Sequence, residues 1–327
     1  MARADLLLNL VRAGSEGDQV GLRRTVEAMI AEERAKHHAA LADRLEAALK
    51  ADPGNKVAAI VSSSDERARQ YFLELLPRRD LNLIVLSEQI RSACKELIEE
   101  QNRSDLLRSY GLEPRHRVLL YGPPGNGKTT LAEALANALA LPMLVVRYET
   151  LIGSFLGETS QRLKSVFDYA RRRHCVLFFD EFDAVAKERG DVHESGEIKR
   201  VVNSLLMQID DLPSSVVVVV ASNHSELLDR AVWRRFQLKL ELTIPDSKAI
   251  RAWFARLEER LAAPIGVPIT KLVAKFFGRS FSDLAEFSED VARRMVLNAP
   301  TNDLKSVIED RLRQLSPTVR KSRRKNG

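Results

Sequence analysis

The sequence contains little cysteine and no long apolar run. Its two cysteines, Cys94 and Cys175, do not form a CxxC pair, which excludes a disulfide framework and a cysteine zinc site. No apolar stretch approaches the roughly 18 residues of a membrane-spanning helix. The apolar part of MARADLLLNLVRAG is also too short for a secretory signal. We therefore expect a cytoplasmic protein that does not bind membranes, with both cysteines buried in a reducing environment.

Acidic residues are missing from the last part of the chain, residues 316–327. This part contains five of the 51 lysines and arginines, and without them the formal net charge falls from +6 to +1. The body of the protein is therefore nearly neutral. We expect a disordered basic tail, which is either a solubilising end or an arm that binds nucleic acid.

Residues 1–52 have the apolar spacing of helices. Between residues 19 and 50, apolar side chains recur every three or four positions, which predicts an amphipathic stripe. A proline and a glycine within 51–55 end this region. The sequence predicts an N-terminal helical hairpin that docks a partner or substrate, followed by a linker over 53–80.

From residue 81 the pattern alternates between short apolar runs and longer amphipathic ones. Several runs are almost continuously apolar, as expected for strands that are covered on both faces. The alternation predicts an α/β fold, with a parallel sheet covered by helices, over 81–245. The predicted strands are 117–122, 141–148, 175–180, 215–222 and 236–242.

After Pro245 the pattern is helical to about residue 315. We expect a small all-helical lid over 246–315, with Asp246 or Ser247 as the N-cap of its first helix.

The strongest motif is GPPGNGKTT at 122–130. It lies between a predicted strand and a predicted helix, and it fits G-x-x-x-x-G-K-[ST], the P-loop or Walker A pattern. Glycines let backbone N–H groups turn towards phosphate oxygens, and the helix N-terminus adds partial positive charge. We expect Lys128 to contact the β- and γ-phosphates of ATP and the Thr129 hydroxyl to bind Mg²⁺. The predicted cofactor-binding residues are Gly122, Pro123, Pro124, Gly125, Asn126, Gly127, Lys128, Thr129 and Thr130.

Acidic residues follow a second apolar run, in VLFFDEFD at 176–183 (Walker B). The carboxyl ends of parallel strands face the ligand crevice of an open α/β sheet. We therefore expect Asp180 to hold Mg²⁺ through water and Glu181 to orient or deprotonate the attacking water. A metal-binding Asp followed by Glu suits a hydrolase better than a kinase, and Asp183 is expected to be structural.

Three more residues are candidates for catalysis. Asn223 follows the strand 215–222, where its amide would position water or contact the γ-phosphate; taken alone, it would be a turn residue. Arg234 and Arg235 precede the strand 236–242, and taken alone they would be solvated. An arginine supplied by a neighbouring subunit would stabilise charge on the γ-phosphate. Such head-to-tail contacts close into rings.

These segments together resemble the AAA ATPases. GPPGNGKTT, FLGETSQRLKSVFDYAR, VLFFDEFDAVAKERG, RVVNSLLMQIDD, VVVASN and LLDRAVWRRF occur in the order, and at about the spacing, of that family, from about residue 80 to 300. The resemblance implies a P-loop domain, a helical lid, a nucleotide-dependent hexameric ring and polypeptide as the usual substrate. The segment 278–296 is similar to the last conserved helix of the lid, with residues 278–283 near the nucleotide.

The resemblance also gives a role to SFLGETS at 154–160. In the AAA family an aromatic residue, an aliphatic residue and a glycine form the central pore loop, and Phe155, Leu156 and Gly157 match them. They would project into the axis of the ring and grip an extended chain. Without the resemblance, Phe155 would be assigned to the core. A second pore loop is expected within 187–200.

Two features depart from the family pattern. The family commonly separates its two arginines as Arg-x-x-Arg-Phe, whereas Arg234 and Arg235 are adjacent, so the sequence leaves open which one reaches the neighbouring nucleotide. The glycine that contacts adenine is not evident in 81–90, where Ile84 or Val85 is expected to pack against the base.

Three functions fit these observations. The first is an ATP- and Mg²⁺-dependent ring of identical subunits that remodels or threads protein substrates. The second is an AAA ATPase that acts on nucleic acid as a loader or translocase, for which the basic tail argues. The third is an ATP-switched regulator of a separately encoded effector such as a protease, in a setting such as phage defence.

Overall fold

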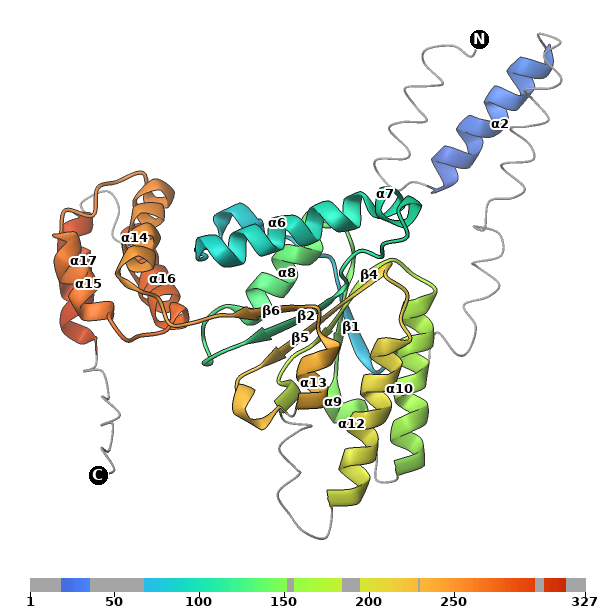
Figure 1. Ribbon diagram of the computed structural model, residues 1–327. Coiled ribbons are helices and arrows are strands. Elements are labelled where there is room, and N and C mark those ends of the chain that lie inside the picture. The colour runs from blue at the N-terminus through green and yellow to red at the C-terminus, as the bar shows by residue number, and fades with distance from the viewer. Residues whose placement is uncertain are drawn as a thin grey trace. The chain divides into compact units, whose positions relative to one another are not determined.

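The computed structural model describes residues 19–35, 68–151, 156–183, 195–228, 230–297 and 303–315 (Figure 1). The chain divides into two units, Met1–Glu66 and Arg67–Gly327. In the first unit the structure describes helix α2 (Gln19–Ala35), in which Met29 and Ile30 are buried. Residues 1–18 and 36–52 of the predicted hairpin and the basic tail over 316–327 lie outside the described residues.

The second unit is built on a six-stranded sheet in the order β1-β3-β4-β5-β2-β6. Five strands are parallel, and β1 pairs antiparallel with β3 at one edge. The five predicted strands are all present, so the predicted α/β fold is confirmed. The strands are β1 (Phe72–Leu75), β2 (Arg117–Tyr121), β3 (Met143–Val146), β4 (Cys175–Phe179), β5 (Val216–Ser222) and β6 (Leu238–Glu241).

Helices cover both faces of the sheet (Figure 1). Alternate strand residues point to opposite faces, so Leu119 belongs to one buried cluster and its neighbours Val118 and Leu120 to the other. The helices that the structure describes in the large domain are η1 (Leu81–Leu83), α6 (Glu88–Asn102), α7 (Ser104–Ser109), α8 (Lys128–Ala138), α9 (Tyr148–Leu151), α10 (Leu156–Arg171), α12 (Ser195–Asp210), η3 (Ser225–Leu227) and α13 (Arg230–Arg235).

The structure corrects the predicted linker over 53–80, because β1 lies inside that range. Phe72 is buried and its ring centroid lies 4.8 Å from that of Tyr169. The Arg147 N–H also donates to the Tyr71 carbonyl at 2.9 Å, which continues the pairing beyond the strand. Residues from Ala68 onwards therefore belong to the sheet domain.

The helices after residue 246 have a hydrophobic core of their own. Phe254, Phe276 and Phe287 meet there with ring centroids 5.0–6.2 Å apart. Asp246 is the N-cap of the first of these helices and accepts from the Ala249 N–H at 2.7 Å. The helices are α14 (Ser247–Leu261), α15 (Ile269–Phe276), α16 (Phe281–Leu297) and α17 (Leu304–Gln314). No helix within the described ranges has the length and apolar character needed to cross a membrane.

Candidate functional site

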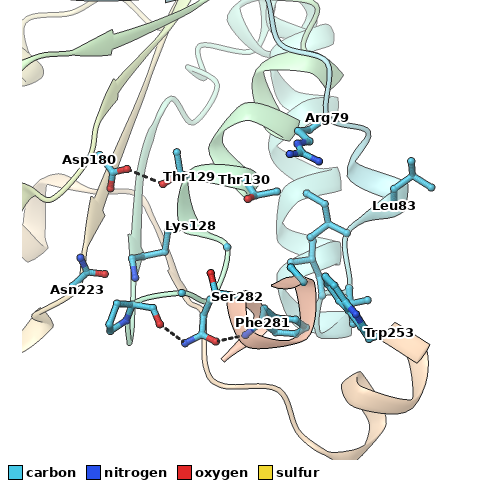
Figure 2. A pocket seen from close by; sticks show the side chains of 18 of the residues that line it. Arg79, Leu83, Lys128, Thr129, Thr130, Asp180, Asn223, Trp253, Phe281 and Ser282 are labelled. Carbon is cyan, nitrogen blue, oxygen red and sulfur yellow. Dashed lines mark hydrogen bonds between the residues drawn. The ribbon is translucent and has the colours of Figure 1, made fainter. Parts of the chain in front are cut away.

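A cavity of about 610 Å³ lies at the carboxyl ends of β2, β4 and β5 (Figure 2). Ligand sites in proteins commonly have about 300–1,000 Å³, so this space can hold a nucleotide. The sequence-predicted residues that line it are Pro124, Gly125, Asn126, Gly127, Lys128, Thr129, Thr130, Asp180, Glu181 and Asn223. The structure therefore brings together residues from three separate motifs.

The loop after β2 depends on glycines at its ends. Gly122 has φ 131°, and a Cβ atom there would lie 2.2 Å from the Leu242 carbonyl oxygen, so no side chain fits between the loop and the end of β6. Gly127 has φ 83° and is the N-cap of α8. The first N–H groups of α8 have no partner within the helix. Helix α8 begins at Lys128, which lines the cavity. Its first N–H groups are therefore well placed to bind phosphate oxygens.

Lys128 folds back over this loop. Its Nζ donates to the carbonyl oxygens of Gly122 at 2.8 Å and Pro123 at 3.0 Å, and the side chain is buried. Burial lowers the pKa of Lys128, while the carboxylates of Asp180 and Asp183 act in the opposite direction. Phosphate oxygens are stronger acceptors than neutral carbonyls because the hydrogen bond is charge-assisted. Lys128 can therefore transfer its hydrogen bonds from the loop to a nucleotide.

We expect nucleotide affinity to fall in the alkaline range, as the pH rises through the depressed pKa of Lys128. Phosphates favour the charged ammonium, so the pKa of Lys128 is higher in the complex than in the free protein. At a pH between these two pKa values the nucleotide binds together with one proton. The affinity therefore falls by up to about tenfold for each unit that the pH rises. Calorimetry in two buffers of different ionisation enthalpy measures this proton uptake. Lys128→Arg, which stays charged, is the control; equal uptake in that variant would contradict the assignment.

Thr129 and Asp180 meet in the wall of the cavity. The Thr129 hydroxyl donates to Asp180 Oδ2 at 2.7 Å (Figure 2). Asp180 Oδ1 accepts from the Glu181 N–H at 2.9 Å. Hydroxyl and carboxylate oxygens are the ligands that Mg²⁺ prefers, and Mg²⁺ usually takes its remaining ligands from phosphates and water. Within the described ranges no group of three or more His, Cys, Asp or Glu side chains could hold a metal. The pair therefore fits a magnesium ion that arrives with a nucleotide.

Glu181 is exposed, lines the cavity and has a left-handed backbone with φ 49°. The left-handed backbone conformation is energetically unfavourable for residues other than glycine, and residues that adopt it cluster at functional sites. The turn is fixed by the next acid along the chain. The buried Asp183 carboxylate accepts from the Ser222 hydroxyl at 3.0 Å and from the Asn223 N–H at 2.9 Å. Asp183 thus ties the end of β4 to the end of β5 and holds Asn223 at the cavity.

The apolar end of the cavity combines Trp253, which the sequence analysis missed, with residues that it expected near the nucleotide, among them Phe281 of the segment 278–283. Trp253 on α14 and Phe281 on α16 both line it, with ring centroids 5.8 Å apart (Figure 2). Ile84 and Val85 line the same cavity, as does Leu83. Flat rings and aliphatic side chains form a suitable environment for a purine base. No local motif marks Trp253, which has the sequence pattern of an ordinary helix residue.

The same end of the cavity joins the lid to the phosphate loop. The Ser282 N–H donates to the Gly125 carbonyl at 2.8 Å, and the Phe281 N–H donates to Asn126 Oδ1 at 3.4 Å (Figure 2). Gly125 has φ 75°, and a Cβ atom there would lie 3.0 Å from the Ser280 hydroxyl oxygen. The lid therefore contacts the backbone of the loop that would hold the phosphates.

The two adjacent arginines of α13 have different environments. Arg235 Nε forms an ion pair with Asp210 Oδ2 at 2.7 Å, and Arg117 pairs with the other oxygen of the same carboxylate at 2.7 Å. Arg234 is exposed and has no hydrogen bond or ion pair with any residue that the structure describes. Neither arginine lines the cavity of its own subunit. Arg235 is held within the subunit, whereas Arg234 can contact another molecule.

The side chains of the predicted pore loop lie outside the part of the chain that the structure describes. Phe155 lies outside the described residues, and Leu156 and Gly157 begin α10 without described side chains. The range 187–200, where a second pore loop is expected, lies mostly outside the described residues as well. Both assignments stay predictions.

Comparison with known proteins places this site in a family. Residues 118–244 match the family described as "ATPase family associated with various cellular activities (AAA)". The chain is 33% identical over 329 residues to an uncharacterized AAA family ATPase of Sinorhizobium fredii, and the match covers 98% of each protein. The chain belongs to the AAA family of ATPases, and it is an ATP hydrolase.

Two other relatives are longer than this chain. One, from Methanothermobacter thermautotrophicus, is named as a homolog of a 26S proteasome regulatory subunit; it is 30% identical over 224 residues, which cover 67% of this chain and 59% of that protein. The other is an "AAA ATPase forming ring-shaped complexes" of Corynebacterium diphtheriae, 32% identical over 246 residues, which cover 65% of this chain and 48% of that protein.

Proposed function

We propose that this ATPase assembles into a ring of identical subunits, a hexamer, that uses Mg²⁺-dependent ATP hydrolysis to remodel or thread polypeptides. The observation that carries the ring is the environment of Arg234. It is exposed, has no partner within the described ranges and lies outside its own cavity. An arginine that completes the site of the next subunit has this placement, and such head-to-tail contacts close into rings.

We assign each site residue a role that the geometry supports. Lys128 and the N–H groups at the start of α8 hold the phosphates, and Thr129 and Asp180 hold Mg²⁺. Bound Mg²⁺ would supply positive charge that offsets the charge of the phosphates. Glu181 orients the attacking water and takes its proton, and the Asn223 amide positions the γ-phosphate or that water. Arg234 of the neighbouring subunit stabilises the charge that develops on the γ-phosphate.

Protein as the substrate is supported by two independent observations. The segment SFLGETS contains Phe155, Leu156 and Gly157, whose order matches the AAA pore loop. Relatives of this chain are named as a proteasome regulatory subunit homolog and as a ring-forming ATPase. An aromatic and an aliphatic side chain grip an extended polypeptide by apolar contact, which does not depend on its sequence.

A substrate trap tests this proposal. Glu181→Gln should bind ATP without releasing its cargo, so the variant purified with ATP from its native cells should retain polypeptide. The retained polypeptide should be lost when Phe155→Ala is added, because the grip is removed while the nucleotide site is intact. Recovered nucleic acid that is removed by nuclease and by salt would contradict the proposal and favour a loader or translocase. An unchanged polypeptide after Phe155→Ala would favour a regulator that binds its effector elsewhere.

A further inference from the structure

A buried amide side chain connects the phosphate loop to the lid. Asn126 lies directly before Gly127, at a position that the G-x-x-x-x-G-K-[ST] pattern leaves open to any residue. Only 3% of its surface is exposed. Burying a polar amide costs free energy unless its donors and its acceptor are paired. The partners of this side chain therefore indicate what Asn126 does.

The donor side of the amide faces the loop itself. Asn126 Nδ2 donates to the Pro123 carbonyl at 3.1 Å and to the Pro124 carbonyl at 3.3 Å. The Pro123 carbonyl also accepts from Lys128 Nζ at 3.0 Å. When the ammonium of Lys128 turns to a phosphate, this carbonyl loses one of two donors and keeps Asn126. The amide therefore stays attached to the loop while Lys128 changes partners.

The acceptor side of the same amide faces the lid. Asn126 Oδ1 accepts from the Phe281 N–H at 3.4 Å, and the neighbouring Gly125 carbonyl accepts from the Ser282 N–H at 2.8 Å. Phe281 and Ser282 are the first two residues of α16, and the first N–H groups of a helix have no partner within it. The phosphate loop thus caps a helix that begins 155 residues after Asn126 in the chain.

These contacts also fix the orientation of the amide. Its nitrogen meets two carbonyl oxygens, and its oxygen meets one N–H. The reverse orientation would place the amide oxygen against two acceptors and the NH₂ group against a donor, so it is disfavoured. One planar group therefore joins both sides, and the position of the loop and the position of the start of α16 depend on each other.

The start of α16 in turn determines the surroundings of Trp253. The rings of Phe281 and Trp253 lie with their centroids 5.8 Å apart at the apolar end of the cavity (Figure 2). Trp253 Nε1 donates at 2.9 Å to the buried hydroxyl of Ser288, which is also on α16. The side chains that would receive the base are therefore connected, through Asn126, to the loop that would receive the phosphates.

We propose that Asn126 is a positioning residue that couples the two ends of the nucleotide site. Its amide holds the loop carbonyls as Lys128 turns to the phosphates, and it passes the shift of the loop to Phe281 and Trp253. Phosphates alone therefore prepare the base end of the cavity. The inference rests on the proposed role of the loop in holding phosphates, and not on the ring or on threading.

The fluorescence of Trp253 tests this coupling. The chain has one other tryptophan, Trp233, which packs against Tyr121 with ring centroids 5.0 Å apart. A Trp233→Phe background therefore leaves Trp253 as the reporter. The probe is inorganic tripolyphosphate with Mg²⁺, which has phosphates but no base that could contact the indole. We expect tripolyphosphate to bind, as measured by calorimetry, and to shift the emission of Trp253.

Asn126→Ala should remove the emission change without removing binding. The affinity for tripolyphosphate should fall about tenfold, the effect of one or two hydrogen bonds, and the emission at saturation should equal that of the empty protein. Asn126→Ser, whose side chain is too short to reach both loop and lid, should behave in the same way if the alanine variant folds poorly. Asn137→Ala is the matched control, because Asn137 is exposed on α8 and does not line the cavity. It should keep the affinity and the emission change.

The outcomes separate this inference from the site on which it rests. A full emission change at saturation in Asn126→Ala would show that Asn126 acts on the loop alone, and it would overturn the coupling. Tripolyphosphate that binds to the reporter protein without changing its emission would do the same. If Lys128→Ala bound tripolyphosphate as tightly as the reporter protein, or if the reporter protein did not bind it, the proposed phosphate site itself would be refuted.

Steady-state kinetics give a second readout. KM for ATP should rise about tenfold in Asn126→Ala, while kcat stays within about threefold of the wild type. The reason is that the three hydrogen bonds of the amide go to the loop and the lid, and none involves Asp180 or Glu181. A loss in kcat larger than the rise in KM would place Asn126 in the hydrolysis step and overturn the proposal.

Discussion

Glu181→Gln should lower kcat for ATP hydrolysis by about 10²- to 10⁴-fold, the usual contribution of a general base, while ATP still binds. The amide keeps the size of the side chain but cannot take the proton of the attacking water. Neither the hydrogen bonds of Lys128 nor the Thr129–Asp180 contact involves the Glu181 carboxylate. Single-turnover hydrolysis and equilibrium binding of ATP, measured on the same preparation, separate the two effects.

Glu226→Gln is the control for this loss. Glu226 is also an exposed glutamate after a central strand, but it pairs with His224 and does not line the cavity. It should retain nearly full activity. If Glu181→Gln hydrolysed ATP at a rate within tenfold of the wild type, another group would have to be the base, and the assignment of Glu181 would be wrong.

Arg234→Ala should lower ATP turnover by roughly 10³-fold or more, as the loss of an arginine supplied in trans does in other phosphoryl-transfer enzymes. The folded subunit should be unaffected, because Arg234 is exposed and forms no hydrogen bond or ion pair with a described residue. Mixing this variant with Glu181→Gln should restore part of the activity. In an equal mixture, about a quarter of the interfaces combine an intact Glu181 with an intact Arg234 from its neighbour. Steady-state ATPase assays of the two variants, alone and mixed, measure the effect.

Arg235→Ala provides the contrast, since it differs from Arg234→Ala by one position. Its ion pair with Asp210 is partly exposed, and Asp210 keeps its second partner, Arg117. The substitution should therefore reduce the free energy of unfolding by no more than about 1 kcal/mol and leave most of the turnover. The reverse result, with Arg235→Ala inactive and Arg234→Ala active, would exchange the roles of the two arginines. Full activity of dilute monomers would rule out a site completed by a neighbour.

The phosphate loop and the acidic strand end could be predicted because their information is local. A strand, a glycine-rich loop and a helix follow one another within about twenty residues. Gly122 and Gly127 occupy loop positions with positive φ, which favour glycine, so the motif itself marks them. The same holds for the five central strands, whose apolar runs are long enough to stand out. Local patterns thus gave the sheet, the loop and the position of the acids.

The features that the sequence did not show depend on distant partners. Strand β1 has four residues, of which only Phe72 is buried, so its pattern of one buried and three exposed positions resembles a loop. Trp253 reaches the cavity from a helix that begins more than a hundred residues after the phosphate loop. The difference between Arg234 and Arg235 comes from Asp210, on another helix, which forms an ion pair with Arg235. In each case the deciding contact is made by the fold and not by neighbours in the sequence.

The strand order also determines when the nucleotide site can exist during synthesis of the chain. Strand β2, which leads into the phosphate loop, lies between β5 and β6, the two strands that are made last. Its partner positions start at Val218, about a hundred residues later, and end at Glu241. A nascent chain that has just completed the loop therefore lacks both strands that hold it in place. Long-range pairing of this kind forms slowly, so nucleotide binding by this protein is a late event of folding, after β6 has closed the sheet against Gly122.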